Sequence, residues 1–108
     1  MAKENRKSPR FECKGRASVQ VAPGLVPWPS RIFNLSADGC FIELERPDLL
    51  LQDSIVELTF TVNDLPFRVW GQVKAVQSDS MIGFRFLLLS DRIRRRLGNS
   101  LEQLIEDL

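Results

Sequence analysis

The sequence predicts a mainly β fold, a six-stranded antiparallel β-barrel with a C-terminal α-helix laid against it. Three observations predict it. Short segments in which hydrophobic and polar residues alternate recur from residue 16 to residue 86. Turn residues, namely glycine, proline, asparagine and aspartate, separate these segments. After Ser90 the hydrophobic period lengthens to that of an amphipathic helix.

The first three predicted strands follow a polar and basic N-terminal arm, residues 1–10, which we expect to be flexible. The first strand covers residues 16–21, and turn material from Pro23 to Pro29 leads to a second strand at residues 31–35. A tight turn at residues 36–39, in which Gly39 can adopt a positive φ, precedes the third strand. The core-facing positions are hydrophobic: Ala17, Val19 and Val21 in the first strand, and Cys40, Ile42 and Leu44 in the third.

The other three predicted strands cover residues 55–62, about 67–76 and 82–86. A short Asn63-Asp64 turn separates the first two, and residues 77–80 turn the chain again. Each strand has one hydrophobic face: Val56, Leu58, Phe60 and Val62 in the fourth, Phe67, Val69, Gly71, Val73 and Ala75 in the fifth, and Ile82, Phe84 and Phe86 in the sixth.

The C-terminal segment, residues 90–108, predicts one amphipathic helix with Ser90 as its N-cap. Gly98 weakens the interior of this helix, so its apolar stripe must pack against the barrel. The basic residues from Arg92 to Arg96 are expected on its solvated face. The stripe consists of Ile93, Leu97, Leu101, Leu104 and Leu108.

Composition limits the function classes. The 108 residues are expected to form one domain, and the net charge of +1 does not suit a basic nucleic-acid coat. Without histidine the chain has no Ser-His or Cys-His pair, and no carboxylate lies in a catalytic motif, so we expect no enzyme and no catalytic residues. The two cysteines, Cys13 and Cys40, make no recognisable metal site and are expected to be reduced hydrophobic residues.

Location and aromatic content give two further expectations. The apolar runs are too short to cross a bilayer and the first residues carry no secretory signal, which favours a cytoplasmic protein without membrane insertion. Trp28 and Trp70 are expected to pack in the core rather than to serve as ligand platforms, because aromatic residues dominate small cores.

Two motifs carry the functional prediction. The N-terminal arm contains Arg6-Lys7-Ser8-Pro9-Arg10, an Arg-x-x-x-Arg pattern. Asn34-Leu35-Ser36-Ala37-Asp38-Gly39 stands between the second and third predicted strands. Taken alone, the first is a weak signal and the second fits a turn capped by its own side chains.

Together, in this order and on this strand pattern, the two motifs resemble those of the PilZ domain family. The resemblance extends from about residue 5 to residue 108 and includes the final strand, Gly83-Phe84-Arg85-Phe86. It implies a cyclic di-GMP receptor that has no metal and no cofactor. The binding residues that it implies are Arg6, Arg10, Asn34, Ser36 and Gly39. The sequence departs from several relatives at Ala75, where they carry an aromatic residue that stacks on guanine.

The chemistry of these residue types suits that ligand. Arginine offers paired donors that match the O6 and N7 acceptors of guanine. Asn34 offers a carbonyl acceptor for the guanine N–H groups, and Ser36 can donate to a phosphate or guanine oxygen. Gly39 allows backbone amides to approach the ligand closely.

We therefore predict a receptor whose N-terminal arm becomes ordered on cyclic di-GMP and engages an unidentified effector protein in motility, biofilm formation or polysaccharide export. The alternative is a ligand-independent adaptor that uses the same fold for protein contacts. A barrel that binds DNA or RNA is disfavoured, because the aromatic residues fall mostly at inward positions. Whether the protein is a monomer or a homodimer stays open.

Overall fold

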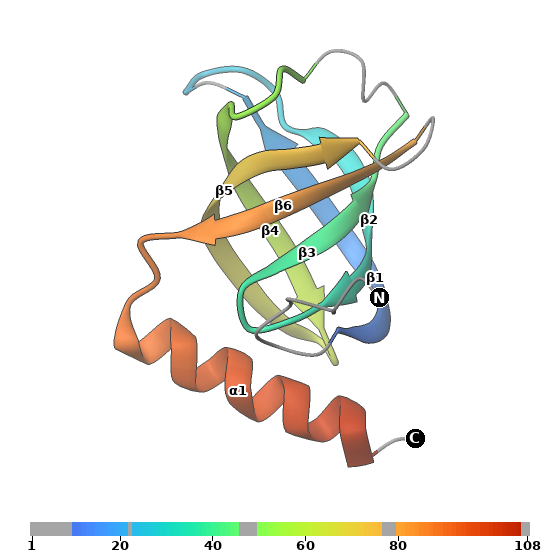
Figure 1. Ribbon diagram of the computed structural model, residues 1–108, viewed down its shortest axis with the longest axis vertical. Helices are drawn as coiled ribbons and strands as arrows, with labels where there is room; N and C mark the ends of the chain where they lie inside the picture. The colour runs from blue at the N-terminus through green and yellow to red at the C-terminus, as the bar shows by residue number, and fades with distance from the viewer. Residues whose placement is uncertain (1–9, 22, 46–49, 77–79, 107–108) are drawn as a thin grey trace, which may run out of the picture.

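The alternating segments form a closed barrel of antiparallel strands in the order β1-β2-β3-β6-β5-β4, with one helix at its end (Figure 1). A computed structural model describes residues 10–21, 23–45, 50–76 and 80–106. The predicted fold class is confirmed. The elements are β1 (Phe11–Gln20), β2 (Trp28–Leu35), β3 (Gly39–Glu43), β4 (Ile55–Val62), β5 (Leu65–Val76), β6 (Met81–Leu87) and α1 (Asp91–Glu106).

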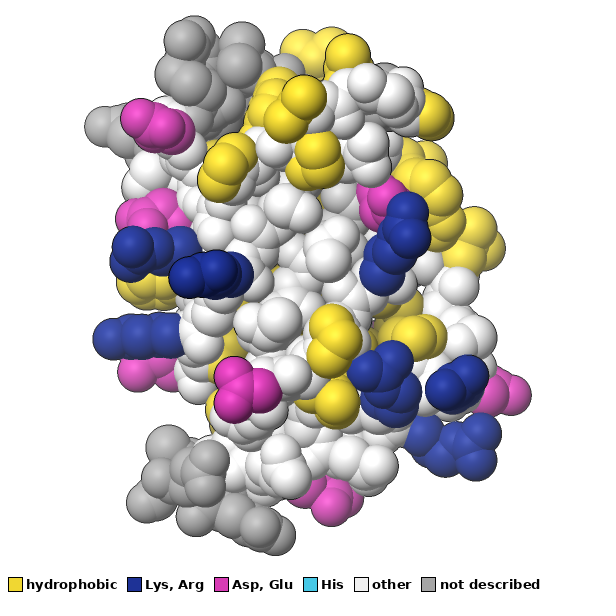
Figure 2. Space-filling model, turned by 180° about the vertical axis from the view of Figure 1, so that it is seen from behind, with side chains coloured by type: hydrophobic (Ala, Val, Ile, Leu, Met, Phe, Trp, Pro, Cys, Tyr) yellow, Lys and Arg dark blue, Asp and Glu magenta, His cyan; other side chains and the backbone are white. Residues whose placement is uncertain are grey.

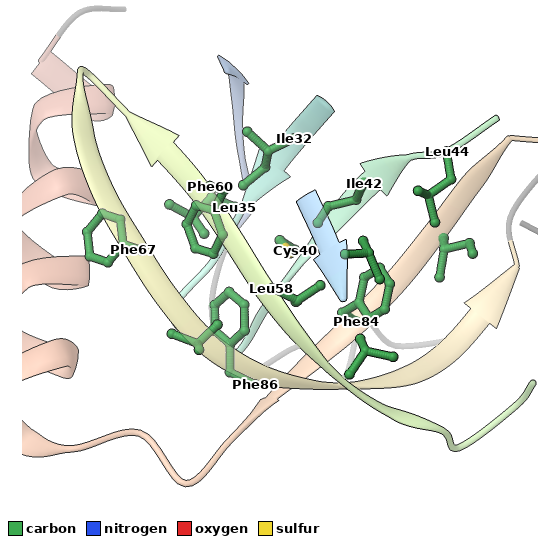
Figure 3. Packing of buried hydrophobic residues seen from close by; sticks show 14 of the residues in the cluster. Ile32, Leu35, Cys40, Ile42, Leu44, Leu58, Phe60, Phe67, Phe84 and Phe86 are labelled. Carbon is green, nitrogen blue, oxygen red and sulfur yellow. The ribbon is translucent and has the colours of Figure 1, made fainter. Parts of the chain in front are cut away.

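Inward-facing side chains from all six strands fill the barrel (Figure 3). Three of its aromatic rings stack in series: Phe60 lies 5.4 Å from Phe67 and 5.9 Å from Phe86, measured between ring centroids. Such offset aromatic pairs add to the stabilisation from the buried apolar area. The fully buried positions follow the predicted alternation and include Val19, Ile42, Val56, Leu58, Val62, Val73 and Ile82.

Three connections lie at the end of the barrel that faces α1: the β2–β3 turn, the β4–β5 turn and the β6–α1 connection (Figure 1). The β4–β5 turn consists of Asn63 and Asp64, both with positive φ, as a two-residue hairpin between right-twisted strands requires. The start of β1 lies at this same end (Figure 1). Antiparallel alternation therefore brings Arg10, which directly precedes β1, toward the β2–β3 turn.

The first two strands begin earlier than predicted. β1 begins at Phe11 and not at residue 16. Trp28 pairs with Val19 and Pro29 with Ser18, so Trp28 and Pro29 belong to β2 and not to the preceding turn. The proline gave the misleading signal, although proline is accepted near the start of a strand. Trp28 is half-buried and packs against the core, as predicted.

Trp70 contradicts the same prediction, because 47% of its surface is exposed. It lies in β5 between the buried residues Val69 and Gly71, so the pleat directs it outward. Val21, expected on the inward face with Val19, follows the end of β1 and is also exposed.

The helix begins as predicted and packs by its apolar stripe. The backbone N–H of Ile93 donates to Ser90 Oγ at 3.2 Å, which is an N-cap hydrogen bond. Leu97 is 1% exposed and belongs to the core cluster, with Ile93, Leu101 and Leu104 packed against that cluster. Leu108, the last residue of the predicted stripe, lies outside the described residues.

Arg96 departs from the solvated role that the sequence predicts. Its Nη2 donates to the carbonyl oxygen of Pro66 at 2.7 Å, and its guanidinium carbon lies 4.8 Å from the centroid of the Phe67 ring. The side chain thus joins α1 to the start of β5, whereas Arg92, Arg94 and Arg95 are exposed as predicted.

Cys13 and Cys40 are free thiols and both are buried, as predicted. Burial raises the pKa of the Cys13 thiol from its ordinary value of 9.0 to about 11, and the charge of Glu12 adds to the effect. Burial likewise raises the pKa of Cys40, and the charge of Arg10 opposes this rise in part. Both cysteines therefore behave as small hydrophobic residues.

The described residues contain no candidate membrane span and no candidate metal site. None of the helices there is long and apolar enough to span a membrane. No group of three or more histidine, cysteine, aspartate or glutamate side chains there is arranged to hold a metal ion.

Candidate functional site

A pocket of about 460 Å³ lies outside the barrel, where β3, β6 and β5 are neighbours. This volume falls within the range of small-molecule sites. The pocket, which we call the β3–β6 pocket, is lined by Arg10, Ser36, Asp38, Gly39, Phe41, Lys74, Ala75, Gly83, Phe84 and Arg85.

The aromatic wall of the β3–β6 pocket is Phe41, an outward-facing residue of β3. The guanidinium carbon of Arg10 lies 4.0 Å from the centroid of its ring, a cation–π contact. Phe41 pairs with Gly83 of β6, and a Cβ atom at Gly83 would come within 2.6 Å of the Phe41 ring. The missing side chain at Gly83 thus allows Phe41 to lie flat on the sheet with Arg10 above it.

The β2–β3 turn is held together by Ser36. The backbone N–H groups of Asp38 and Gly39 both donate to Ser36 Oγ at 3.2 Å, and the hydroxyl donates to the Gly39 carbonyl oxygen at 3.3 Å. The backbone N–H of Ser36 donates to the same carbonyl oxygen at 2.9 Å. Ser36 is only 4% exposed, so its hydroxyl serves the turn itself.

Gly39 is required for a reason other than the predicted one. Its φ is not positive; among the described glycines only Gly24 has a positive φ. A Cβ atom at Gly39 would instead collide with the carbonyl oxygen of Phe84 on β6. Glycine therefore permits a close approach of two strands at the edge of the pocket.

The structure brings together three of the five predicted binding residues. Arg10, Ser36 and Gly39 all line the β3–β6 pocket. Asn34 does not: it lies on β2 beside Phe41, with which it pairs. Its Oδ1 atom is buried and has no hydrogen-bond partner among the described residues. Arg6 lies outside the described residues.

The sequence reasoning missed four side chains of the pocket: Asp38, Phe41, Lys74 and Arg85. Arg85 also lines an adjoining pocket of about 320 Å³, together with Asp38 and Arg94 of α1. The alternation placed Phe41, Lys74 and Arg85 on outward strand faces, and Asp38 lies in the β2–β3 turn, which indicated that these side chains face solvent. Their convergence on one pocket could not be found in the sequence, because it depends on the pairing of β3 with β6 and of β6 with β5.

Ala75 was predicted to face the core with Val73, and this prediction is wrong. The pairing of β5 with β6 shifts register between Val73 and Ala75, so Lys74 is an extra residue and Ala75 pairs with Gly83. Ala75 consequently faces outward and lines the pocket. The β3–β6 pocket thus has only a methyl group at the position where several relatives are expected to carry an aromatic ring.

The charge of the pocket lining favours an anion. Arg10, Lys74 and Arg85 contribute three cations, and Asp38 is the one acidic residue among the described residues of the lining. Lys74 Nζ also lies 3.6 Å from Asp53 Oδ1, a pairing between two exposed side chains that is weak in water. A ligand with negative phosphates and flat rings would match these cations and the Phe41 ring.

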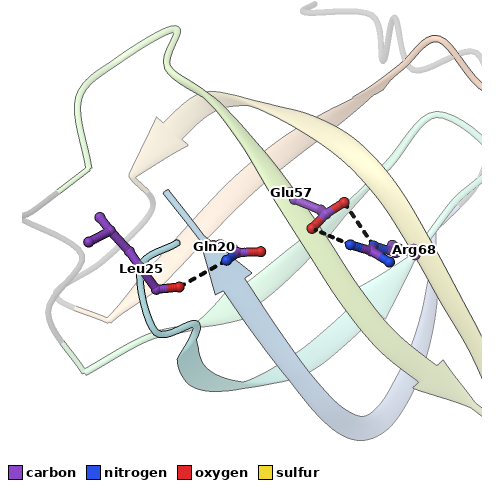
Figure 4. Close-up of polar contacts among 4 residues, drawn as sticks. All are labelled: Gln20, Leu25, Glu57 and Arg68. Atoms are coloured by element: carbon purple, nitrogen blue, oxygen red, sulfur yellow. Dashed lines mark hydrogen bonds and ion pairs between the residues drawn. The ribbon is translucent and has the colours of Figure 1, made fainter. Parts of the chain in front are cut away.

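A second groove, of about 350 Å³, runs along β4, β5 and the end of β1; we call it the Trp70 groove. Its rim carries an ion pair in which Arg68 donates to both carboxylate oxygens of Glu57, at 2.8 and 3.2 Å (Figure 4). Hydrogen bonding to Glu57 raises the pKa of Arg68. Gln20, also on the rim, donates to the carbonyl oxygen of Leu25 at 2.9 Å (Figure 4). Exposed hydrophobic side chains gather at the nearby end of the barrel, away from the helix (Figure 2).

One domain description recurs among the known proteins that this chain resembles. A family model described as the PilZ domain matches residues 4–103. Among solved structures, the PilZ domain of YcgR from Escherichia coli with c-di-GMP has a TM-score of 0.77 at 16% identity, over 96% of this chain and 94% of that one. A comparison with curated protein sequences found no match.

Two longer structures contain the same fold. YcgR from Escherichia coli in complex with c-di-GMP has a TM-score of 0.83 at 16% identity, over 96% of this chain and 47% of that chain. The MrkH–c-di-GMP complex of K. pneumonia has a TM-score of 0.82 at 19% identity, over 98% and 54%. The chain therefore spans about half the length of these two proteins, and at such identities the likeness concerns the fold.

Proposed function

The chain belongs to the PilZ domain family, and from this premise we propose that it is a receptor without catalytic activity that binds cyclic di-GMP in the β3–β6 pocket. The observation that carries the proposal is the meeting of Arg10 with the Ser36–Gly39 turn in one pocket lined by three cations and an aromatic ring. The named partner of several solved relatives, c-di-GMP, has the flat purines and phosphates that such a lining suits.

Each proposed contact uses a different feature of the pocket. The guanidinium of Arg10, already held above the Phe41 ring, presents its donors to the O6 and N7 atoms of a guanine. Lys74 and Arg85 face the phosphates. Lys74 offers them the compact charge of its ammonium group, and Arg85 offers the paired donors of its guanidinium. The backbone at Gly39 gives the ligand a side-chain-free surface. Ser36 contributes by holding this turn, and Asn34 flanks the pocket beside Phe41.

We assign Arg6 the second arginine contact, because it precedes Arg10 by four residues in the N-terminal segment. Binding would then order the part of the N-terminal arm that precedes Arg10 over the pocket, and the ligand contacts must exceed the entropy cost of that ordering. The new surface would engage an effector protein that controls motility, biofilm formation or polysaccharide export.

Isothermal titration calorimetry with cyclic di-GMP tests the proposal. Wild-type protein should bind, and Arg10→Ala should weaken binding by about five- to a hundredfold, the value of a bidentate arginine–guanine contact. Arg10→Lys should fail to restore the affinity, because lysine has the charge without the fork.

Arg92→Ala is the matched control, since Arg92 begins the other Arg-x-x-x-Arg pattern but is exposed on α1 and does not line the pocket. It should bind like the wild type. Absence of any heat with wild-type protein at tens of micromolar ligand in low salt would reject the proposed function.

A second candidate function, the ligand-independent adaptor, is favoured by the exposed Trp70 and its groove. Large exposed aromatic residues mark protein contact sites more often than other surface residues do. This function would replace the first under two conditions. Wild-type protein would bind no cyclic dinucleotide, and Trp70→Ser, but not Arg10→Ala, would abolish the control of motility, biofilm formation or polysaccharide export in cells.

A further inference from the structure

The segment that joins β6 to α1 carries an exposed leucine in an unfavourable backbone conformation. Leu88 has a φ of 55°, in the left-handed region that favours glycine or asparagine. Its exposed fraction, 90%, is the highest among the exposed large hydrophobic residues that the structure describes. Both features oppose folding, because the conformation is strained for leucine and the side chain gains no burial.

Arginines follow Leu88 in the N-terminal half of α1. Arg92, Arg94 and Arg95 are exposed, and none of their side chains has an ion pair or hydrogen bond within the described part of the chain. The N-terminus of a helix is the positive end of its macrodipole, so cations are unfavourable there, whereas the last turn of α1, which would favour them, has none. Repulsion between Arg92 and Arg95, which are neighbours on the helix surface, adds to this cost.

These unfavourable features form one surface, which consists of Leu88, Arg92, Arg94 and Arg95 and which we call the α1 entry surface. Figure 2 shows Lys and Arg side chains gathered at the N-terminal end of α1, at the lower right of that view. Local choices in a folded sequence normally agree with the fold, and departures from that agreement concentrate at functional sites. The surface therefore fits a partner that supplies negative charge and apolar contact.

The α1 entry surface adjoins the proposed ligand site. Arg94 lines the smaller pocket together with Arg85, and Arg85 also lines the β3–β6 pocket. The start of β1, where the N-terminal arm joins the barrel, lies at the same end of the molecule (Figure 1). A partner on this surface would thus lie close to both parts of the proposed receptor.

The chemistry of the surface favours a protein segment over nucleic acid or lipid. A duplex offers phosphates but no apolar side chain for Leu88, and proteins that bind one neutralise more phosphates than three arginines can. A lipid surface requires an apolar helix face that is free, whereas the apolar stripe of α1, Leu97 included, packs against the barrel. An acidic protein segment supplies carboxylates for the arginines and an apolar side chain for the leucine.

We propose that an effector protein docks on the α1 entry surface through a segment in which apolar side chains are flanked by aspartate or glutamate. The carboxylates accept paired hydrogen bonds from Arg92, Arg94 and Arg95, and an apolar side chain covers Leu88. The inference rests on the part of the proposed function that assigns an effector protein, and it names the surface and the chemistry of that contact.

Fluorescence anisotropy tests the proposal with the full chain and a fluorescein-labelled synthetic peptide in which each leucine lies between glutamates. Wild-type protein should bind the peptide, with an affinity that falls as salt rises. A peptide with glutamine in place of glutamate should bind about tenfold more weakly or worse.

Charge reversal on α1 tests the arginines. The double variant Arg92→Glu, Arg95→Glu should lose about tenfold or more in peptide affinity. Because glutamate suits the positive end of a helix, the variant should melt no lower than the wild type, which separates lost binding from lost folding. The control is Arg16→Glu, Arg31→Glu, the same change in net charge at two exposed positions that pair between β1 and β2. It should bind the peptide like the wild type.

Leu88→Asn tests the apolar contact. Asparagine adopts a positive φ readily, so the melting temperature should stay the same or rise, while the peptide affinity should fall by about three- to tenfold. Leu51→Asn, at another exposed leucine, is the control and should keep the affinity.

The outcomes separate the docking surface from the proposed ligand. If the wild type binds the peptide with this pattern of variants but binds no cyclic di-GMP, the proposed ligand fails and the docking surface stands. If it binds cyclic di-GMP but no peptide, with or without that ligand, or if the arginine and Leu88 variants bind the peptide like the wild type, the docking surface is overturned. Tighter binding to phosphatidylcholine–phosphatidylserine vesicles, or to a DNA duplex, than to the peptide would overturn the choice of a protein partner.

Discussion

At the scale of single residues, Phe41 acts on the proposed ligand through Arg10. The 4.0 Å contact between the guanidinium carbon and the ring centroid orients the arginine fork before any ligand arrives. We predict that Phe41→Leu weakens cyclic di-GMP binding by about three- to tenfold, and that Phe41→Tyr restores it.

The double variant shows whether this effect passes through Arg10. In an Arg10→Ala background, Phe41→Leu should change the affinity little further, because the residue that it positions is gone. Equal losses in both backgrounds would instead assign Phe41 its own contact with the ligand. The side-chain Nε–Hε resonance of Arg10 should also lose its ring-current shift in Phe41→Leu, with or without ligand.

Alanine substitutions at Gly39 and Gly98 should change the free energy of unfolding in opposite directions. A methyl group at Gly39 would collide with the Phe84 carbonyl oxygen, whereas nothing lies within 4 Å of a Cβ atom at Gly98. Gly39→Ala should destabilise the protein by about 1–3 kcal/mol, the usual cost of overpacking. Gly98→Ala should stabilise it by about 0.5–1 kcal/mol, because alanine favours the helix. Urea denaturation followed by circular dichroism measures both.

These residues show what could be predicted of the site. Arg10, Ser36 and Gly39, which line the β3–β6 pocket, were predicted as site residues because a motif records residue types at fixed spacing along the chain. Phe41 and Arg85 were not, since they reach the pocket by strand pairing, which a motif does not record.

At the scale of elements, Arg96 helps the apolar stripe to hold α1 on the barrel. Its hydrogen bond to Pro66 and its contact with Phe67 are lost in Arg96→Ala, which should lower stability by about 1–2 kcal/mol. Hydrogen exchange of α1 amides should accelerate as the helix undocks more often. Arg95→Ala, at an exposed neighbouring position, should change stability by no more than about 0.5 kcal/mol.

The elements themselves were largely predictable, and the exceptions have physical causes. Alternation located the strands, because each has one face in the core. It failed at Ala75, where the extra residue Lys74 reverses the faces without any change in composition. The pattern also did not predict the hydrogen bond between Arg96 and Pro66, since the position of a helix on a barrel is a tertiary property.

At the scale of the whole molecule, the buried thiols make stability depend on alkaline pH. The Cys13 thiol has a pKa of about 11 in the folded protein against 9.0 ordinarily, so the unfolded chain releases its proton first. Above pH 9 the unfolded state therefore binds fewer protons, and stability falls until about pH 11. We predict a falling melting temperature over this window.

The double variant Cys13→Ala, Cys40→Ala isolates this effect. The chain contains no tyrosine, so lysine is the other side-chain type that titrates in the same range. The variant should be less stable at neutral pH but should show a flatter decline from pH 9 to 11. An equally steep decline would mean that the lysines, not the thiols, cause it.

The closed barrel limits how this protein can bind a partner protein. Every described strand has a neighbour on each side, so none of them is a free edge strand along which a foreign strand could pair in full. Recognition of the barrel itself then depends on the side chains of its outer wall. A change of one outward residue can then redirect recognition while the inward residues, and the scaffold that they support, stay as they are.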